Sequence, residues 1–210
     1  MTAKPQLIVR GRKFDQVLEG ARTVFMRDGF ERASVDDIAR EAGVSKATLY
    51  AYFPDKRLLF LEIASAECQR QAQDAESRID PNAPIAQVLR VAAEKITAFM
   101  LSDFGQRIFR IAVAESENFP AVGHEFYHSG PKLVKDRIAE ALRCACDRGE
   151  LVIDDIPFAA AQFAQLCKVD IQDRALFMPA PCCSPAEATK VIEGAVAMFM
   201  ARYAAPKPTL

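Results

Sequence analysis

The stretch from Phe14 to Pro54 constrains the fold most, because it holds three short helical segments separated by residues that stop helices. Apolar residues recur at helical spacing over its first part and stop at Gly29, a residue type that favours the position after a helix. Ser34 is a helix N-cap for a second segment that Gly43 ends, and Ser45 begins a third. The sequence therefore predicts three short helices with a tight turn between the last two, a helix-turn-helix.

Apolar residues of the second and third segments predict which side of this unit is buried. They are Val35, Ile38, Ala39, Val44, Leu49 and Phe53. With this set inside, Lys46, Ala47 and Tyr50 would lie on the exposed side of the third helix. A helix with such a free side fits the major groove of DNA, where its first residues reach base edges.

The remainder of the 210-residue chain also has a helical pattern. Pro54 ends the third segment, and Asp55 caps a fourth helix expected over 55–79. Further helices are expected at 84–101, 104–118, 121–148 with a break at Gly130-Pro131, 156–171 and 184–204. Residues 149–153 are expected to form a short extended connector, and alternating strand patterns are otherwise missing.

We therefore predict an all-α protein of about nine helices in two domains. Residues 1–56 would form an N-terminal arm and a three-helix helix-turn-helix domain, residues 57–210 a helical domain, and helix 55–79 the link; the family resemblance given below implies ligand binding and dimerisation for the domain 57–210. The first part contains ten Lys and Arg against eight Asp and Glu, and the second contains 17 against 20. A slightly basic end on an acidic body suits a protein that touches phosphates at one end.

Targeting signals, metal sites and catalytic motifs are not recognised. No apolar run approaches the roughly 20 residues that span a bilayer, and the first residues do not resemble a secretory signal, so a cytoplasmic protein is expected. No cysteine pair has C-x-x-C spacing, which favours reduced thiols over a metal site. The six cysteines are Cys68, Cys144, Cys146, Cys167, Cys182 and Cys183. We expect no cofactor and no enzymatic activity.

The region Phe14–Ile63 resembles the DNA-binding domain of TetR-type regulators. The resemblance rests on Gly29-Phe30, Ser34 to Ala39, Gly43 to Tyr50 and Tyr52 to Lys56. It implies a helical homodimer that binds a palindromic double-stranded operator and is usually a repressor released by a small molecule. It also implies that the fourth helix acts as a lever, which changes the separation of the two recognition helices when ligand binds.

Resemblance and side-chain chemistry together point to nine DNA-contacting residues. They are Ser34, Val35, Ser45, Lys46, Ala47, Thr48, Tyr50, Tyr52 and Lys56. Lys46 can donate to guanine and Ala47 can contact a thymine methyl, although the family often has glycine at this second position. The tyrosine hydroxyls and Lys56 would contact phosphates. Taken singly, the tyrosines could be packing residues and the lysines solvated; the joint pattern favours DNA contact.

The C-terminal part carries a weaker resemblance, to the AefR-like subgroup. Its basis is Glu115-x-x-x-Phe119-Pro120 and Phe126-Tyr127-x-x-Gly130-Pro131. By resemblance, an effector pocket would lie among helices 84–101 to 156–171. The candidate lining residues are Phe99, Phe109, Val113, Phe126, Tyr127, Phe163 and Cys167. Such a wall favours an apolar or aromatic small molecule, although aromatics at helical spacing are more often core.

The resemblance also implies that the last two expected helices, 156–171 and 184–204, form a four-helix bundle across the twofold axis of a dimer. Small and large apolar residues form a stripe on the final helix, at Ala188, Val191, Ile192, Ala195, Met198 and Phe199. The alternative is burial of this stripe within the monomer. His124 and His128 have metal-competent spacing but no evident third ligand, so they are interpreted as polar surface residues.

Two other functional classes are considered. An enzyme would need a nucleophile with a base, a phosphate loop or a metal triad, and none is recognised. A helical interaction module with a vestigial helix-turn-helix would not bind DNA. Within the main interpretation, an activator or a ligand-independent regulator is the alternative to a repressor.

Overall fold

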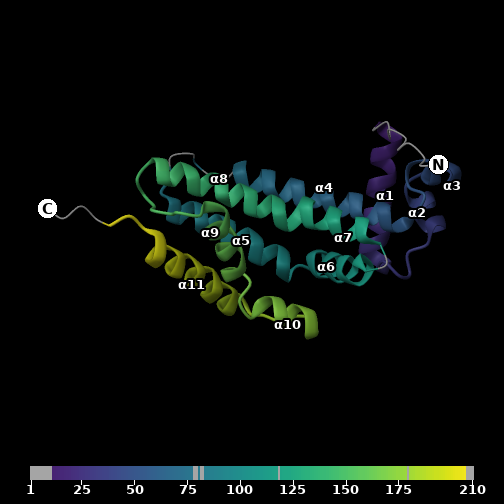
Figure 1. The fold of residues 1–210 in the computed structure, drawn as a ribbon. Coiled ribbons are helices and arrows are strands. Elements are labelled where there is room, and N and C mark those ends of the chain that lie inside the picture. Colours follow the sequence, from purple (N-terminus) through teal and green to yellow (C-terminus); the bar gives the residue numbers. More distant parts are fainter. Residues whose placement is uncertain (1–10, 78–79, 81–82, 118, 179, 207–210) are drawn as a thin grey trace.

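The computed structural model describes residues 11–77, 80, 83–117, 119–178 and 180–206. Over these residues it is built from α-helices, with one π-helical turn and one isolated β-bridge. The expected all-α class is confirmed. Figure 1 shows an elongated molecule in which the first three helices gather at one end and the C-terminal end of the chain lies at the other. None of the described helices is long and apolar enough to cross a membrane.

Three helices form one end of the molecule, called here the head: α1 (Arg12–Asp28), α2 (Val35–Glu41) and α3 (Lys46–Tyr52). Both predicted serine caps are present. The hydroxyl of Ser34 accepts a hydrogen bond from the amide of Asp37 at 3.0 Å, and that of Ser45 accepts one from Thr48 at 3.1 Å. Gly43 makes the sharp turn between α2 and α3 with a φ of +63°, a left-handed conformation that costs glycine little. The helix-turn-helix geometry is confirmed.

The apolar residues that the sequence assigns to the inside do form the core of the head. Ile38, Leu49 and Phe53 are buried, and Val35 and Val44 pack against this core while half-buried. Phenylalanine rings from α1, the α1–α2 loop and α4 complete it through edge and tilted contacts of 5.2 to 5.7 Å. Leu49 of α3 and Phe53, which directly follows this helix, belong to the same core and hold α3 on the head.

The long helix α4 (Lys56–Ser77) leaves the head and runs along the remaining helices, called here the body. The body consists of α5 (Ile85–Leu101), α6 (Asp103–Ser116), α7 (Pro120–Tyr127), the π-helical turn η1 (His128–Lys132), α8 (Leu133–Asp147), α9 (Ile156–Leu166), α10 (Ile171–Phe177) and α11 (Pro185–Tyr203). The first turns of α4 belong to the head core, where Leu59, Phe60 and Ile63 are buried.

One helix of the body also enters the head core. Ile108 of α6 is fully buried among the apolar residues of the head, and Phe104 and Ile111 of the same helix pack against them. Helices α5, α8, α9 and α11 enclose a second core that contains Phe163 of α9 and Phe199 of α11. Head and body are therefore joined by α6 as well as by α4.

The expected helix 121–148 is divided by η1, which contains Pro131. Proline has no amide hydrogen and its ring crowds the preceding turn, so the helix widens there instead of continuing as a regular α-helix. The expected break is thus present. The extended connector is also confirmed, because Leu151 forms an antiparallel bridge with Ala204.

The expected helix 156–171 is too long. The structure ends α9 at Leu166 and begins the separate, unexpected helix α10 at Ile171. Between them, Asp170 has a φ of +62°, a conformation that residues other than glycine rarely adopt. Apolar residues continue on both sides of this turn, so the hydrophobic pattern alone does not reveal it.

The last helix begins with a capping box. The amide and hydroxyl of Ser184 donate to the carboxylate of Glu187 at 2.8 and 2.7 Å, and Arg174 of α10 donates to the same carboxylate at 2.8 Å. The hydrogen bonds from Ser184, followed by the one from Arg174, lower the pKa of Glu187 to about 2. This carboxylate therefore holds the start of α11 and joins it to α10.

We expect Glu187→Gln to reduce the free energy of unfolding at pH 7. Because the folded-state pKa lies below the ordinary 4.5, the stabilisation is present above pH 4.5 and is lost as the pH falls towards 2. Urea unfolding of both proteins from pH 7 to 2 should show the difference shrinking over that interval. Glu193→Gln on the same helix, where the carboxylate lies 3.7 Å from Arg90, is the control and should change little. A constant difference across this pH range would contradict the prediction.

Candidate nucleic-acid interface and effector site

The outer side of α3 is exposed at several of the positions predicted to contact DNA. Ser45, Lys46 and Ala47 are exposed, and Tyr50 exposes half of its surface. Leu49, on the opposite side, is 1% exposed. The alternation follows from helical geometry, because the residue that anchors α3 in the core turns its neighbours outwards. Four of the predicted contacts thus share one exposed side.

Lys46 makes an ion pair across the helix-turn-helix. Its ammonium lies 2.5 Å from the carboxylate of Asp36 in α2, and this hydrogen bond raises the pKa of Lys46. Both side chains are more than half exposed, so the pair contributes little to stability and can open. The ion pair holds Lys46 beside the N-terminus of α2 until a stronger acceptor, such as a guanine edge or a phosphate, replaces the carboxylate.

The remaining predicted contacts lie around this side with less freedom. Thr48 is half-buried and its hydroxyl is 2.8 Å from that of Ser45. Tyr52 is half-buried with its ring edge-on to Phe14 at 5.7 Å. Their DNA contacts, like those of Ser34 at the start of α2 and of its half-buried neighbour Val35, remain predictions.

Lys56 differs from the other predicted contacts because its ammonium is bonded to backbone carbonyls of the protein. Its ammonium donates to the carbonyls of Phe30, Glu31 and Ala33 at 2.9 to 3.4 Å and lies 4.5 Å from the centre of the Phe30 ring. Three carbonyl acceptors and an aromatic face occupy the whole ammonium. We therefore expect Lys56 to hold the α1–α2 loop against α4, and a phosphate contact would require these bonds to break.

The variant Lys56→Met should lower the free energy of unfolding by about 1.5–3 kcal/mol, because it removes charged hydrogen bonds and leaves carbonyls without a donor. It should leave unchanged the slope of operator affinity against salt concentration, since that slope counts the phosphates neutralised. Lys46→Met is the matched control and should show the reverse: little loss of stability and a clear loss of operator affinity at fixed salt. A shallower slope for Lys56→Met would instead establish a phosphate contact.

Arg57 connects the head to the body, a role that the sequence analysis missed. Its guanidinium forms an ion pair with Asp55, lies 3.6 Å from the carboxylate of Glu115 in α6, and stacks 3.4 Å above the ring centre of Phe119. Glu115 and Phe119 belong to the motif Glu115-x-x-x-Phe119-Pro120, which was the available signal. An arginine with a carboxylate on one side and an aromatic face on the other thus joins the start of α4 to the end of α6.

The structure places the seven residues predicted to line an effector pocket in different parts of the molecule. Phe109 and Phe126 contact each other at 6.2 Å, and Phe126 packs against the head core. Phe163 and Cys167 are fully buried in the body core. The other three are Phe99, which is half-buried, Val113, which is 56% exposed, and Tyr127, which is 47% exposed. They do not gather into one cavity wall in this conformation.

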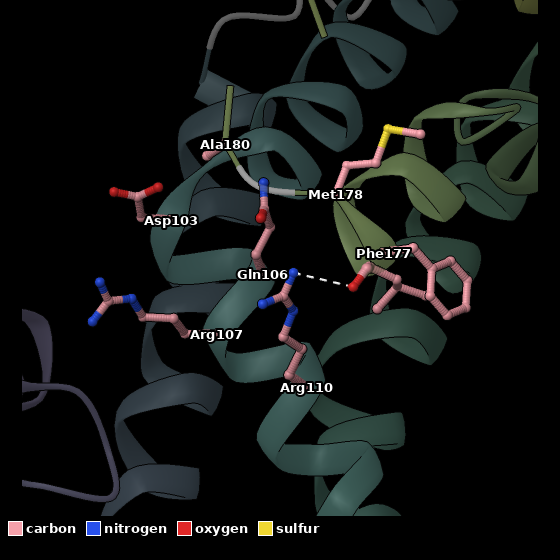
Figure 2. A pocket seen from close by; sticks show the side chains of 8 residues that line it. Asp103, Gln106, Arg107, Arg110, Phe177, Met178 and Ala180 are labelled. Carbon is pink, nitrogen blue, oxygen red and sulfur yellow. Dashed lines mark hydrogen bonds between the residues drawn. The ribbon is translucent and has the colours of Figure 1, made fainter. Parts of the chain in front are cut away.

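Two hollows of the structure are lined by residues other than these seven. One, of about 360 Å³, lies between α6 and the end of α10 and is lined by Arg107, Arg110, Phe177 and Met178 among others. In Figure 2 the Arg110 side chain lies beside the end of α10, whereas that of Arg107 points away from it. Arg110 donates there to the carbonyls of Ala175 and Leu176. The second hollow, of about 510 Å³, lies between α9 and α11, and neither includes any of the seven predicted residues.

The second hollow forms part of an apolar surface on α9 and α11. Phe158 is 58% exposed, Met198 is 63% exposed, and Val169 just beyond α9 is 55% exposed. The predicted stripe on α11 is split by this arrangement: Ala195 and Phe199 are buried in the monomer, whereas Met198 faces solvent. Burial within the monomer therefore applies to part of the stripe, and a dimer interface at its exposed part stays a prediction.

The histidine and cysteine side chains offer little reactive chemistry in the described part of the chain. The rings of His124 and His128 stack at 4.2 Å on the surface, and no group of three potential metal ligands is found among the described residues. Burial raises the pKa of Cys68 to about 11 and that of Cys167 to about 12. Both thiols stay protonated near neutral pH and are poor nucleophiles.

Two family profiles match separate parts of the chain. Residues 17–63, which cover most of the head and the start of α4, match the bacterial regulatory proteins of the tetR family. Residues 87–205, which cover most of the body, match the C-terminal domain of AefR-like transcriptional repressors.

Solved structures share the fold over almost the whole chain. A TetR-family transcriptional regulator from Mesorhizobium loti has a TM-score of 0.77 at 22% identity and covers 92% of this chain and 97% of its own. The Flavonoid-responsive Regulator FrrA has a TM-score of 0.69 at 31% identity and covers 93% of this chain and 98% of its own.

Curated relatives match shorter segments. The HTH-type transcriptional repressor AcnR of Corynebacterium efficiens is 36% identical over 58 residues, 28% of this chain and 31% of that protein. The HTH-type transcriptional activator FasR of Mycolicibacterium smegmatis is 31% identical over 94 residues, 45% of this chain and 43% of that protein. The chain thus spans less than half the length of these curated relatives.

The AefR-like profile covers more than half of the chain, and the tetR profile covers the helix-turn-helix described above. The family consists of DNA-binding regulators and not of enzymes, and its members include repressors and an activator. The chain belongs to the TetR family of transcriptional regulators, with an AefR-like C-terminal domain.

Proposed function

We propose that this chain is a homodimeric repressor that binds a palindromic operator and is released from it by a small molecule. The observation that carries the proposal is the exposed side of α3, where Lys46, Ala47 and Tyr50 lie together on a helix held by a buried core. A capped helix with polar and small side chains on its free side can enter the major groove with its first residues at the bases.

The dimer would form through α9 and α11. Their apolar surface, with Phe158 and Met198 more than half exposed, is the kind of patch that marks a protein interface. Pairing two copies across a twofold axis would bury it and place two α3 helices for successive major grooves, roughly 34–36 Å apart. The surface lies far along the molecule from the head, so DNA binding and pairing would not compete (Figure 1).

The response to a small molecule would pass through α6 and α4. Ile108 in the head core and the contacts of Arg57 with Glu115 and Phe119 give a ligand in the body a physical route to the head. A ligand that binds the DNA-incompetent arrangement a hundredfold better would shift the equilibrium by about 2.7 kcal/mol. The name of FrrA describes that relative as flavonoid-responsive, which supports a small-molecule effector for this chain as well.

Repression is favoured because the matched C-terminal profile is that of AefR-like transcriptional repressors. AcnR is a repressor and FasR is an activator, so family membership alone admits both. We expect the protein to act in the cytoplasm, where the chromosome is accessible to it.

Selection of bound sequences from random duplex DNA is the decisive experiment. A palindrome with half-sites about one helical turn apart is the expected result, since it requires the dimer and the recognition helix together. Enrichment of a single half-site would contradict the dimer. No enrichment at low salt would contradict DNA binding itself, and transcription from a promoter with and without the selected site separates repressor from activator.

A further inference from the structure

The hollow beside the end of α10 is bounded on one side by a polar stripe of α6. The stripe consists of Asp103, Gln106, Arg107 and Arg110. Their spacing of three and four residues places them on one side of the helix. The hollow has a volume of about 360 Å³, which is within the size range of small-molecule sites. Two cations and one carboxylate line this side, so the charge that it presents is positive.

The protein uses only part of the Arg110 guanidinium. Its Nη2 atom donates to the carbonyls of Ala175 and Leu176 at 2.8 and 3.2 Å, in the last turn of α10 (Figure 2). In the described part of the chain, its Nε and Nη1 atoms donate to no acceptor, and neither Arg107 nor Arg110 forms an ion pair. The hollow therefore offers guanidinium donors whose charge no described carboxylate neutralises.

The side of the hollow formed by the end of α10 is partly apolar. Leu176 is half-buried there, and Met178, just beyond the helix, is 52% exposed. A methionine side chain is flexible and polarizable, so it adapts to the shape of an apolar group placed against it. A molecule with an acidic group at one end and an apolar body therefore matches the two sides of the hollow.

The opposite side of α6 lies in the head. Phe104 and Ile111 pack against the head core and Ile108 is fully buried in it, at positions that alternate along the helix with those lining the hollow. Arg107 itself reaches the head, because its Nη1 atom lies 3.6 Å from the position that a Cβ on Gly29, the residue that ends α1, would occupy. A molecule in the hollow would thus contact the body helix that completes the DNA-binding end.

The hollow between α9 and α11 is less suited to this role. It belongs to the apolar surface that the proposed dimer would bury, and none of its lining residues lies on α4 or α6. A molecule bound there would have no direct contact with either helix that joins the body to the head.

We infer that the hollow between α6 and the end of α10 is the effector site, and that the effector is an organic acid. Its carboxylate would accept hydrogen bonds from Arg110, with Arg107 as the second cation, and its apolar body would cover Met178. This inference rests on the proposed small-molecule response and names its site and the chemical class of its ligand. The site is separate from the seven residues that the sequence predicts, since none of them lines this hollow.

The experiment compares acids with their neutral amides. The probes are benzoate, cinnamate and octanoate, each paired with the corresponding amide. Calorimetric titration measures their binding, and fluorescence anisotropy measures the affinity for the selected operator in their presence. On the wild type, at least one acid should bind and weaken operator binding, while its amide should do neither. Arg110→Met should weaken binding of that acid at least about tenfold, as expected for loss of a charged hydrogen bond.

A second variant guards against a merely structural effect, because Arg110 also holds the end of α10. Met178→Ala leaves that contact intact and shortens an exposed side chain. It should melt at the same temperature as the wild type and bind the acid about fivefold more weakly, since less apolar surface is covered. Arg143→Met removes an exposed cation from α8, is the matched control, and should bind the acid normally.

Three results would each overturn the inference: an amide as effective as its acid, no binding of any of the three acids, or an unchanged acid affinity in both Arg110→Met and Met178→Ala. An acid that binds in the hollow without changing operator affinity would overturn the assignment as effector site. Wild-type operator binding without any acid is measured in parallel, so that failure of the acid site and failure of DNA binding are separate results.

Discussion

Replacing Lys46 and Tyr50 together by alanine should weaken operator binding on the order of 100-fold or more while the protein stays folded and dimeric. A good base contact, as predicted for Lys46, contributes a factor of roughly 10 to 100. The phosphate contact predicted for Tyr50 adds to this factor, and a palindrome presents every contact twice. Both side chains project from the exposed side of α3 and contribute nothing to the head core, so the fold should not suffer. Fluorescence anisotropy with the selected operator at fixed salt measures the affinity.

The matched control removes one cation and one aromatic ring from the body instead of from α3. Arg143→Ala with Phe177→Ala deletes one exposed cation and one exposed ring from the body, the ring being 84% exposed. It should leave operator affinity unchanged. Equal affinities of the α3 variant and the wild type, with an unchanged melting temperature, would place the DNA interface elsewhere or remove it altogether.

The variant Met198→Glu should convert the dimer into a monomer and abolish tight operator binding. Met198 is 63% exposed in the monomer and stands on the apolar surface of α9 and α11. In the proposed dimer its replacement would bury two unpaired carboxylates, each costing about 3–5 kcal/mol. The dimer dissociation constant should therefore rise by at least on the order of a thousandfold.

Sedimentation velocity across a range of concentrations measures this change directly. Val113→Glu places the same charge at another exposed apolar position, on α6, and should leave the dimer intact. A Met198→Glu protein that sediments as a dimer would rule out the α9–α11 surface as the interface. A monomer that still binds the full palindrome as tightly as the wild type would show that pairing is not needed for recognition.

Features of the head that depend on near neighbours in the chain were predictable from the sequence. Ser34 and Ser45 cap α2 and α3 through amides three residues away, and Gly43 needs only its own backbone freedom to form the turn. Periodicity also separated buried Leu49 from exposed Tyr50, because a helix of known phase has only one inward side.

Features that depend on distant contacts were not predictable. The hydrogen bonds that Lys56 donates within the protein were not expected, because their acceptors, such as the carbonyl of Phe30, lie up to 26 residues away in the chain. The turn at Asp170 depends on a backbone conformation with positive φ, which an aspartate in the sequence does not indicate. The sequence placed Phe163 on a helix correctly but did not show whether its ring lines a pocket or fills the core. That depends on which neighbours pack against the ring.

The position of Ile108 has a consequence for isolating or exchanging the domains of this protein. Its side chain completes the hydrophobic interior of the DNA-binding end from a helix more than fifty residues further along the chain. An excised N-terminal fragment would expose the apolar side chains that this isoleucine covers, and a chimaera with a foreign regulatory half would need a side chain of matching volume there. We therefore expect thermal melting to be a single cooperative transition in which the head and the body unfold together.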